Sequence, residues 1–420
     1  MRTAVTRTEP VSVSKPATTI TADVAVVGGS VAGSSAAAVL AAAGLEVVLI
    51  ERETHFRDRV RGESIHPWGV SQLQALGLAD VVRSAGAQPL PFTRAYTQRV
   101  PSEPSNWESI DPRLPSEWAI YHPTLQTALL EHAQRSGVRI LHPARVTHLQ
   151  RERAPQLEIS TEQGRVSVQA RLVVGADGRH SAARRWIGAN TIHDPVHHQV
   201  GGCLLDEVEL ADDTFHVANF EGGQVLLFPQ GNGRARTYLL VLEPFADRLR
   251  GRQHVAEYIA QCAGVFPVGA LQNARAAGPL AFFPNADVWS DRLHAGRVVL
   301  IGDAAGANDP SGGHGLSLCF RDVRELRDQL LNTSDWDRAL PAYAKQRMAY
   351  YSVLRTYMQW MVPLYIGVGP EADARRARNA RASQADPTLG GFGRLLAYGP
   401  DGLTADEAAR RHVLGEDLDG

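Results

Sequence analysis

The pattern of apolar and small residues is clearest near the start of the chain. Residues 23–27 form a short apolar run that predicts a buried strand, and residues 34–43 are almost all small and favour a helix. Gly44 is typical of a helix end, and residues 45–50 form a second apolar run. A strand, a helix and a strand in this order predict a β-α-β unit with parallel strands.

Two later apolar runs also predict buried strands, and each ends in an acidic motif. The run at residues 172–174 leads into Asp177 and Gly178, and the run at residues 297–301 leads into Asp303. Acidic residues directly after buried strands lie where the carboxyl ends of a parallel sheet can meet a ligand.

The middle of the chain has a different periodicity. Residues 199–244 alternate apolar and polar positions, with turn signals at 221–223 and 230–233, which predicts an antiparallel sheet. Residues 245–275 predict helices and loops of the same lobe, and a further helical region is expected from residue 336 onward.

The first turn carries candidate chemistry. Gly28 permits a tight turn, the small Ser30 lets backbone approach a pyrophosphate, and Gly33 lets the helix pack closely on the strand. The helix N-terminus then offers amide donors to the phosphates. Glu51 ends the second strand, where a carboxylate can bind ribose hydroxyls. This motif alone does not distinguish FAD from NAD.

Composition and charge exclude several classes. Of 43 basic residues only Lys15 and Lys345 are lysine, so the other 41 are arginine. Together with 45 acidic residues they give a net charge of −2, which argues against a nucleic-acid partner. No apolar run reaches the ~18 residues of a membrane span. Three widely spaced cysteines indicate neither a disulfide framework nor a metal site. Residues 1–21 lack the apolar core of a signal peptide and predict a disordered tail, so a cytoplasmic protein is expected.

Three motifs in this order carry a family resemblance. They are GxGxxG as Gly28/Ser30/Gly33, DGxxSxxR as Asp177-Gly178, Ser181 and Arg184, and GDAA as Gly302-Asp303-Ala304-Ala305 leading to Pro310. Over about residues 22–350 the sequence resembles the class A flavoprotein monooxygenases, the para-hydroxybenzoate hydroxylase-like family. Ser30 stands where the family usually has glycine, and Gly306 where it usually has histidine.

The resemblance implies an α/β fold in which a Rossmann-like FAD-binding domain of the GR2 type is interleaved with an antiparallel-sheet substrate domain. The expected FAD-binding segments are 22–90, 118–192 and 284–335, and the substrate-binding segments are 91–117 and 193–283. Residues 336–420 are expected to form a C-terminal helical region.

The implied cofactor is FAD, with NADPH or NADH as co-substrate on the same domain, because no second glycine-rich β-α-β unit occurs. The residues predicted to bind FAD are Gly28, Ser30, Gly33, Glu51, Arg52, Arg61, His122, Asp177, Gly178, Asp303, Gly312, Gly313, Gly315 and Leu316. By resemblance Arg61 faces the pyrophosphate and Asp303 the ribityl chain. A helix from near Leu316 would direct its amides at the flavin N1/O2 edge.

Pro310 and His314 are the candidate catalytic residues, because the third motif places them against the flavin. His314 could donate to N1, or it could be a histidine of a surface loop. The pair His197-His198 has no third ligand at metal spacing, so an exposed loop is expected there.

The resemblance implies a monooxygenase that consumes NAD(P)H and transfers one oxygen of O2, through a C4a-hydroperoxyflavin, to an aromatic, polycyclic or unsaturated small molecule of secondary or aromatic metabolism. A monomer or homodimer is expected. Hydroxylation, epoxidation and Baeyer–Villiger insertion stay open, and the substrate-side acid/base is unassigned.

Three alternatives remain. A geranylgeranyl-reductase-like saturase shares the Gly-Glu-Ser and Gly-Asp segments, and a flavin-binding protein without turnover would share all of the motifs. A flavin-dependent halogenase would need a substrate-side lysine, but none occurs between Lys15 and Lys345.

Overall fold

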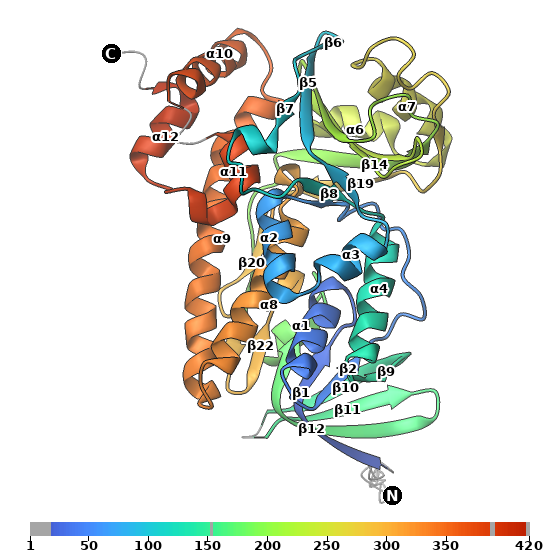
Figure 1. The fold of residues 1–420 in the computed structure, drawn as a ribbon, viewed down its shortest axis with the longest axis vertical. Coiled ribbons are helices and arrows are strands. Elements are labelled where there is room, and N and C mark those ends of the chain that lie inside the picture. Colours follow the sequence, from blue (N-terminus) through green and yellow to red (C-terminus); the bar gives the residue numbers. More distant parts are fainter. Residues whose placement is uncertain (1–17, 152–153, 387–390, 417–420) are drawn as a thin grey trace, which may run out of the picture.

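The computed structural model describes residues 18–151, 154–386 and 391–416. The chain forms an elongated molecule in which a parallel sheet with its helices lies in one half and an antiparallel sheet in the other (Figure 1). The long helix α9 (Trp336–Ile366) runs along the side of the first half and reaches the second. The two sheets therefore meet at the middle of the molecule.

The parallel sheet is built around the predicted β-α-β unit. Its parallel strands, in spatial order, are β9 (Arg139–Leu141), β2 (Val47–Ile50), β1 (Thr18–Val27), β12 (Gly164–Gly175) and β22 (Val298–Leu300). Antiparallel strands extend this sheet. Strand β11 (Gln156–Thr161) pairs with β12, β10 (Ala144–Gln150) pairs with β11, and β21 (His294–Ala295) pairs with β22. Strands β2 and β22 and the C-terminal ends of β1 and β12 are buried and apolar, as expected of parallel strands covered on both faces, whereas β9 at the edge is exposed to half-buried.

Three helices pack on one face of this sheet: α1 (Val31–Ala42), α4 (His122–Arg135) and α8 (Gly315–Leu331). The small residues of α1 are buried along nearly its whole length, so α4 and α8 can approach it closely on either side. Helix α1 begins at Val31, three residues earlier than the sequence pattern predicted, so its first turn lies directly against the glycine-rich motif.

The second sheet has nine strands. They are β5 (Phe92–Thr97), β6 (Val100–Pro101), β7 (Ser105–Asn106), β14 (His198–Asp206), β15 (Thr214–Phe220), β16 (Gly223–Pro229), β17 (Ala235–Val241), β18 (Arg275–Ala276) and β19 (Ala281–Asn285). Its pairs are antiparallel except β5 with β15. Because side chains alternate along a strand, Tyr238 and Leu240 point to one face and Leu239 to the other. Leu239 packs in the cluster that includes Tyr258 of α7 (Val255–Ala263), so helix α7 covers the face opposite Tyr238.

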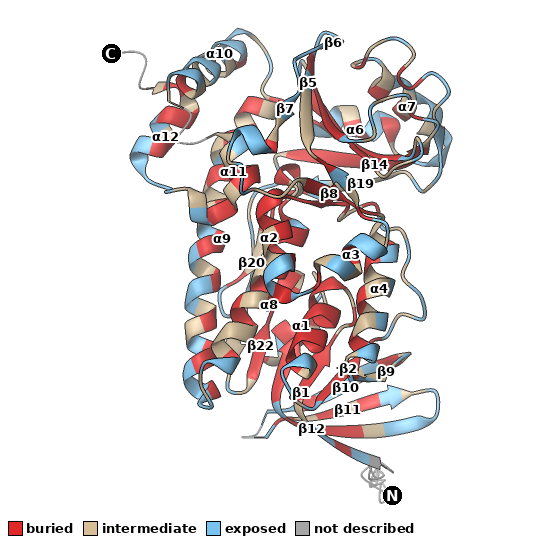
Figure 2. Cartoon of the chain, viewed as in Figure 1, coloured by how far each residue is buried: buried red, intermediate tan, exposed pale blue. Residues whose placement is uncertain are grey.

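Shorter elements complete the fold. Two three-stranded sheets are formed by β3 (Ser64–Ile65), β8 (Glu117–Ala119) and β4 (Gln88–Leu90), and by β13 (Thr191–His193), β20 (Val288–Ser290) and β23 (Gly306–Ala307). The remaining helices are α2 (Pro67–Leu76), α3 (Ala79–Ser84), α5 (Ala182–Trp186), α6 (Glu243–Leu249), α10 (Pro370–Ala385), α11 (Phe392–Tyr398) and α12 (Glu407–Leu414). Figure 2 shows buried residues along the inner side of α9 and a largely exposed α10.

Two sequence predictions are corrected by the fold. Residues 18–21, predicted to lie in the disordered tail, belong to β1, because Thr18–Thr21 pair with Val166–Gln169 of β12; residues 1–17 lie outside the described part. The His197-His198 pair was expected in an exposed loop, but His198 begins β14 and is buried. None of the described helices combines the length and the apolar character that a membrane span requires.

Candidate functional site: a cofactor cavity between the two sheets

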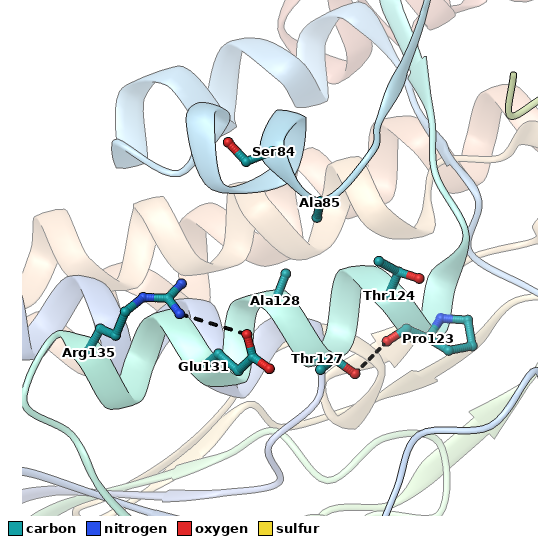
Figure 3. Close-up of a pocket in the computed structure, with 8 residues that line it drawn as sticks. All are labelled: Ser84, Ala85, Pro123, Thr124, Thr127, Ala128, Glu131 and Arg135. Atoms are coloured by element: carbon teal, nitrogen blue, oxygen red, sulfur yellow. Dashed lines mark hydrogen bonds and ion pairs between the residues drawn. The ribbon is translucent and has the colours of Figure 1, made fainter.

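A cavity of about 540 Å³ lies where the two sheets meet. Its wall combines the first turn of the parallel sheet, the loop after β2, the loop before α8 and one face of the antiparallel sheet. The volume falls in the range of about 300–1,000 Å³ that is usual for ligand sites. A second depression, between α3 and α4, is lined by mostly small side chains and an Arg135–Glu131 ion pair of 3.8 Å (Figure 3).

The first turn is as tight as the glycine motif predicts. Gly28 has a φ of 104°, and a Cβ there would lie 2.4 Å from the carbonyl oxygen of Ala176. A Cβ on Gly33 would lie 1.8 Å from the carbonyl oxygen of Gly28. Gly28 and Ser30 line the cavity, whereas Gly33 does not. Gly33 therefore acts through the close packing of helix on strand, as the sequence predicted.

The first amides of α1 face the cavity without a capping side chain. Ser30 is the N-cap residue, but its hydroxyl makes no cap hydrogen bond and instead accepts one from Gln126 Nε2 at 2.7 Å. Glu51 is buried and accepts the Gly29 and Glu53 amides at 2.5 and 2.7 Å. The strand end thus fixes Glu51 beside an uncapped helix N-terminus, where a phosphate is favoured.

Arg61 lines the cavity and forms no hydrogen bond or ion pair with any described residue. Burial lowers its pKa, while Asp303 acts in the opposite direction. Arg52 also lines the cavity, but it is half-exposed and lies 3.4 Å from a Glu53 oxygen. A desolvated arginine without a local anion is costly unless a ligand supplies the negative charge.

His122, at the start of α4, lines the same wall. Its Nδ1 donates to the carbonyl oxygen of Gly62 at 2.8 Å. Burial lowers the pKa of His122 to about 4, and the neighbouring Arg61 acts in the same direction. The imidazole is therefore neutral at physiological pH, with Nε2 left as an acceptor.

The mid-chain motif is held mainly by its own helix. Asp177 lines the cavity, and its carboxylate accepts the Ser181 hydroxyl at 2.5 Å and the Ala182 amide at 2.6 Å. The buried Arg184 of the same motif donates to the carbonyl oxygens of Asp303 and Ala304, both at 2.8 Å. The DGxxSxxR motif therefore holds the backbone of the GDAA motif in place through Arg184.

Asp303 itself reaches the cavity, and Arg179 Nε lies 3.7 Å from its carboxylate. A second carboxylate, Asp322 of α8, fixes the start of this segment by accepting the Gly302 amide at 2.8 Å. Asp322 and Arg347 of α9 form a fully buried ion pair of 3.4 Å. Sequence reasoning missed this pair, because nothing local marks two charges 25 residues apart as partners.

The loop before α8 lies over the cavity. Pro310, Gly313, Gly315 and Leu316 line it, as does Gly178, whereas Gly312 does not. No side chain caps the N-terminus of α8. The first amides of this helix are therefore available to a ligand.

His314 has a different position from the one predicted. It does not line the cavity, and it is completely buried, so the surface-loop alternative is wrong. Gly313 has a φ of 66°, and the centroid of the His314 ring lies 5.0 Å from that of the buried His66. His66 Nε2 in turn donates to the carbonyl oxygen of Gly312 at 2.8 Å. The motif gives the position of His314 along the chain, but not the direction of its side chain.

The antiparallel sheet gives the cavity an apolar wall with one polar pair. The apolar side chains are Val200, Leu226, Phe228, Leu240 and Phe283. Among them the Tyr238 hydroxyl donates to Glu63, and both residues line the cavity. The alternation of β17 and the Gly62-Glu63-Ser64 run were visible in the sequence, but only the fold brings them together.

The Tyr238–Glu63 pair is supported by charges outside the cavity. The completely buried Arg236 lies 3.1 Å from Glu63 and donates to Asp58 at 2.7 Å. Burial raises the pKa of Glu63, opposed chiefly by Arg236, and it also raises the pKa of Tyr238. Because burial outweighs the opposing effect of Arg236, Glu63 is a stronger proton acceptor than an exposed glutamate.

Together these features fit a dinucleotide with a pyrophosphate: two uncapped helix N-termini, a turn that only glycine allows, and an unpaired arginine. Within the described residues, no three His, Cys, Asp or Glu side chains are grouped as metal ligands. The fold and the site thus define a flavoprotein-type enzyme in which an apolar wall lies beside the cofactor site.

A family model described as an FAD binding domain matches residues 21–351, and the chain belongs to this family. It is an FAD-dependent enzyme of the monooxygenase class. The chain is 27% identical over 331 residues to a putative FAD-dependent monooxygenase, YetM, of Bacillus subtilis, covering 77% of this chain and 88% of YetM.

The chain is also similar to a further curated relative and to a solved structure. A digeranylgeranylglycerophospholipid reductase of Methanococcoides burtonii is 25% identical over 313 residues, which cover 70% of this chain and 71% of the reductase. The solved structure of p-nitrophenol 4-monooxygenase PnpA from Pseudomonas putida superposes with a TM-score of 0.74 at 19% identity, covering 96% of this chain and 98% of PnpA. This second likeness concerns the fold.

Proposed function

We propose that this enzyme consumes NADPH or NADH and inserts one oxygen atom of O2 into an aromatic, polycyclic or unsaturated small molecule. The observation that carries the proposal is that a single cavity has two kinds of wall. The glycine-rich turn and the loop before α8, which fit FAD, line one part of it, and apolar side chains of the antiparallel sheet line another. Bound FAD would accept hydride from the nicotinamide and activate O2. The chain has to bind the substrate beside the cofactor and exclude water.

The apolar wall of the antiparallel sheet would bind the substrate. Phe228 and Phe283 present ring surface to the cavity, and Leu226 and Leu240 lie beside them. Such a wall favours a flat or extended apolar ligand over a sugar or an amino acid, because few polar partners are offered.

The Tyr238–Glu63 pair supplies the substrate-side acid and base that the sequence left unassigned. A substrate hydroxyl beside Tyr238 would give its proton to the tyrosine oxygen as the tyrosine passes its own proton to Glu63. The net charge of the site is unchanged, because the negative charge moves from Glu63 to the substrate oxygen. Arg236 and Asp58 act as positioning residues for Glu63.

Reduction of an alkene is the second candidate, because a reductase of unsaturated lipids is among the relatives. The same Tyr238–Glu63 pair could then deliver a proton to carbon. Halogenation has less support: a substrate-side lysine, which the halogenase resemblance would require, is absent between Lys15 and Lys345.

The test uses FAD-loaded protein with 1-naphthol as probe. Oxidation of NADPH and NADH is followed in parallel with O2 uptake, and products are analysed by mass spectrometry with O2 labelled with the heavy isotope. We expect one labelled oxygen atom in the product. Product formed without O2, or reduction of an alkene probe under anaerobic conditions, would support the reductase. Nicotinamide oxidation that yields only hydrogen peroxide with every probe would count against the monooxygenase.

The role of the pair is tested separately. Tyr238→Phe and Glu63→Gln are expected to lower kcat for 1-naphthol and remove a proton-transfer limb from its pH profile, while FAD affinity stays unchanged. Thr237→Ser, on the opposite face of β17, is the matched control. An unchanged pH profile in both variants would exclude the proposed proton transfer.

A further inference from the structure

A buried histidine beside the loop before α8 has a hydrogen-bond acceptor at each of its ring nitrogens. His66 is 2% exposed and does not line the cavity. Its Nδ1 lies 3.1 Å from Oε1 of Glu117, and its Nε2 lies 2.8 Å from the carbonyl oxygen of Gly312. The same Glu117 oxygen also accepts the hydroxyl of Ser64, which lines the cavity. None of these contacts has a role in the proton transfer proposed for Tyr238.

The fold holds this histidine in place from two sides. Ile65 of β3 pairs with Trp118 of β8 in an antiparallel register, so the residues next to this pair, His66 and Glu117, come side by side. The backbone amide of His66 donates to the hydroxyl of Ser317, in the first turn of α8, at 3.1 Å. The ring is therefore fixed relative both to the carboxylate and to the start of α8.

The hydrogen bonds of His66 require a hydrogen on both ring nitrogens. A carbonyl oxygen can only accept, so Nε2 must carry the N–H that points to Gly312. Glu117 is completely buried, and no arginine or lysine of the described residues pairs with it. Its hydrogen bond from Ser64 favours the ionised carboxylate, which can also only accept. Nδ1 must then carry a hydrogen too, which makes the ring an imidazolium.

The groups around the pair are consistent with a single shared charge of each sign. His66 is faced by Glu117 from β8, by the Ser317 hydroxyl from α8 and by the His314 ring from the loop. Burial lowers the pKa of His314, and His66 acts in the same direction, so His314 is neutral. A buried imidazolium and carboxylate stabilise each other, and either one alone would be costly.

The peptide that His66 holds has little orientation of its own. Gly312 and Gly313 are adjacent, and glycine adopts φ of either sign with similar ease. Gly313 lines the cavity with a φ of 66°, and its amide donates to the carbonyl oxygen of Pro310 at 3.0 Å. The Gly312 carbonyl oxygen is bound by a residue outside the cavity wall. The bond to His66 thus selects one orientation of this peptide beside the uncapped N-terminus of α8.

We propose that His66 is a positioning residue of the cofactor site: as an imidazolium paired with Glu117, it holds the Gly312 carbonyl and so fixes the backbone that lines the cavity at Gly313. The ligand that depends on this orientation is FAD, the cofactor of the family to which the chain belongs. The inference goes beyond the proposed oxygen transfer and does not rest on it.

The protonation of the ring is tested by nitrogen NMR of FAD-loaded protein whose histidines carry the heavy nitrogen isotope. At pH 7.5 an exposed histidine, with a pKa of about 6.5, is mostly neutral. His216 is the matched control: it is equally buried and its Nε2 faces the Ala211 carbonyl oxygen at 2.9 Å, but its Nδ1 faces the Tyr96 hydroxyl, which can donate. We expect two N–H groups on His66 and one on His216. A neutral His66 ring overturns the proposal.

The charge of the partner is tested with Glu117→Gln in the same experiment. The new amide has no charge, but its NH2 group can donate to Nδ1 while Nε2–H still donates to Gly312. We therefore expect His66 to lose one of its two N–H signals and FAD affinity to change little. Two N–H groups on His66 in this variant would overturn the pairing with Glu117.

The positioning role is tested by FAD affinity, with two double variants that leave no buried charge. His66→Leu/Glu117→Leu removes the bond to Gly312, and His66→Gln/Glu117→Gln keeps an N–H donor at that position. We expect FAD to bind about tenfold more weakly to the leucine variant, because the released peptide populates orientations that do not fit the ligand. The glutamine variant and His216→Leu should bind FAD nearly as the wild type does.

The free energy of unfolding of the FAD-free proteins separates positioning from a general structural role. Replacing a buried ion pair by apolar residues is often neutral or stabilising, so the leucine variant should fold and still bind FAD weakly. Wild-type affinity in the leucine variant, or equal weakening in the glutamine variant, overturns the proposal. If the leucine variant does not fold, the NMR comparison of wild type with Glu117→Gln decides. No readout involves turnover, so failure here and failure of the proposed oxygen transfer are distinguishable.

Discussion

The buried ion pair between Asp322 and Arg347 gives the sharpest prediction about how the C-terminal helix supports the cofactor site. Arg347 lies 3.4 Å from Asp322 and donates to the carbonyl oxygen of Gly306 at 3.1 Å. Asp322 also accepts the Gly302 amide and, at 2.6 Å, the Tyr350 hydroxyl. Arg347→Met keeps most of the side-chain volume but leaves an uncompensated carboxylate at a position with no solvent exposure. Loss of one partner of a buried pair costs about 3–5 kcal/mol.

The loss of stability in Arg347→Met should increase as the pH rises. Burial raises the pKa of Asp322, opposed chiefly by Arg347, so removing the arginine raises this pKa further. A carboxyl whose folded pKa is raised destabilises the fold as pH increases through that value, so Arg347→Met should be less stable at pH 8 than at pH 5.5.

The free energy of unfolding is measured by denaturant titration of FAD-free protein, together with FAD affinity. Asp322→Asn/Arg347→Met should recover most of the loss, because no buried charge remains. Arg297→Met is the control, since its 2.8 Å pair with the largely exposed Asp337 should contribute about 1 kcal/mol or less. A loss below about 1 kcal/mol in Arg347→Met, or a double variant that shows the sum of both single losses, would refute this reasoning.

Three further predictions concern the cavity. Gly33→Ala places a Cβ 1.8 Å from the carbonyl oxygen of Gly28 and should weaken FAD binding at least about tenfold in a fluorescence titration; normal affinity would contradict the packing role. Arg61→Met should weaken FAD binding yet stabilise the FAD-free protein in denaturant, because an unpaired desolvated cation is removed; unchanged affinity would exclude a ligand contact. Burial lowers the pKa of His122 and of His198 to about 4, so the unfolded chain binds these protons first as pH falls below 6.5. Stability should fall by about 3 kcal/mol per histidine between pH 6.5 and 4, and less in His122→Asn or His198→Asn.

The sequence predicted those parts of the site in which contacts are local. The close approach of Gly33 to Gly28, the acid at the end of the second strand and the Asp177–Ser181 cap are each made within a few residues or within one β-α-β unit. For these, spacing and residue type determine geometry. His314 shows the limit, because its ring is buried against His66 and does not line the cavity, and no periodicity of the sequence records this.

What the sequence by itself determined is the cofactor-binding framework: the order of strands and helices and the three motifs that lie at strand ends. Only the tertiary structure decided which distant side chains share a microenvironment. Glu63 meets Tyr238, Asp322 meets Arg347, and Glu117 meets His66, because sheet register and helix packing bring these segments together. Their chemistry depends on burial and on the partner, and neither is a property of the local sequence.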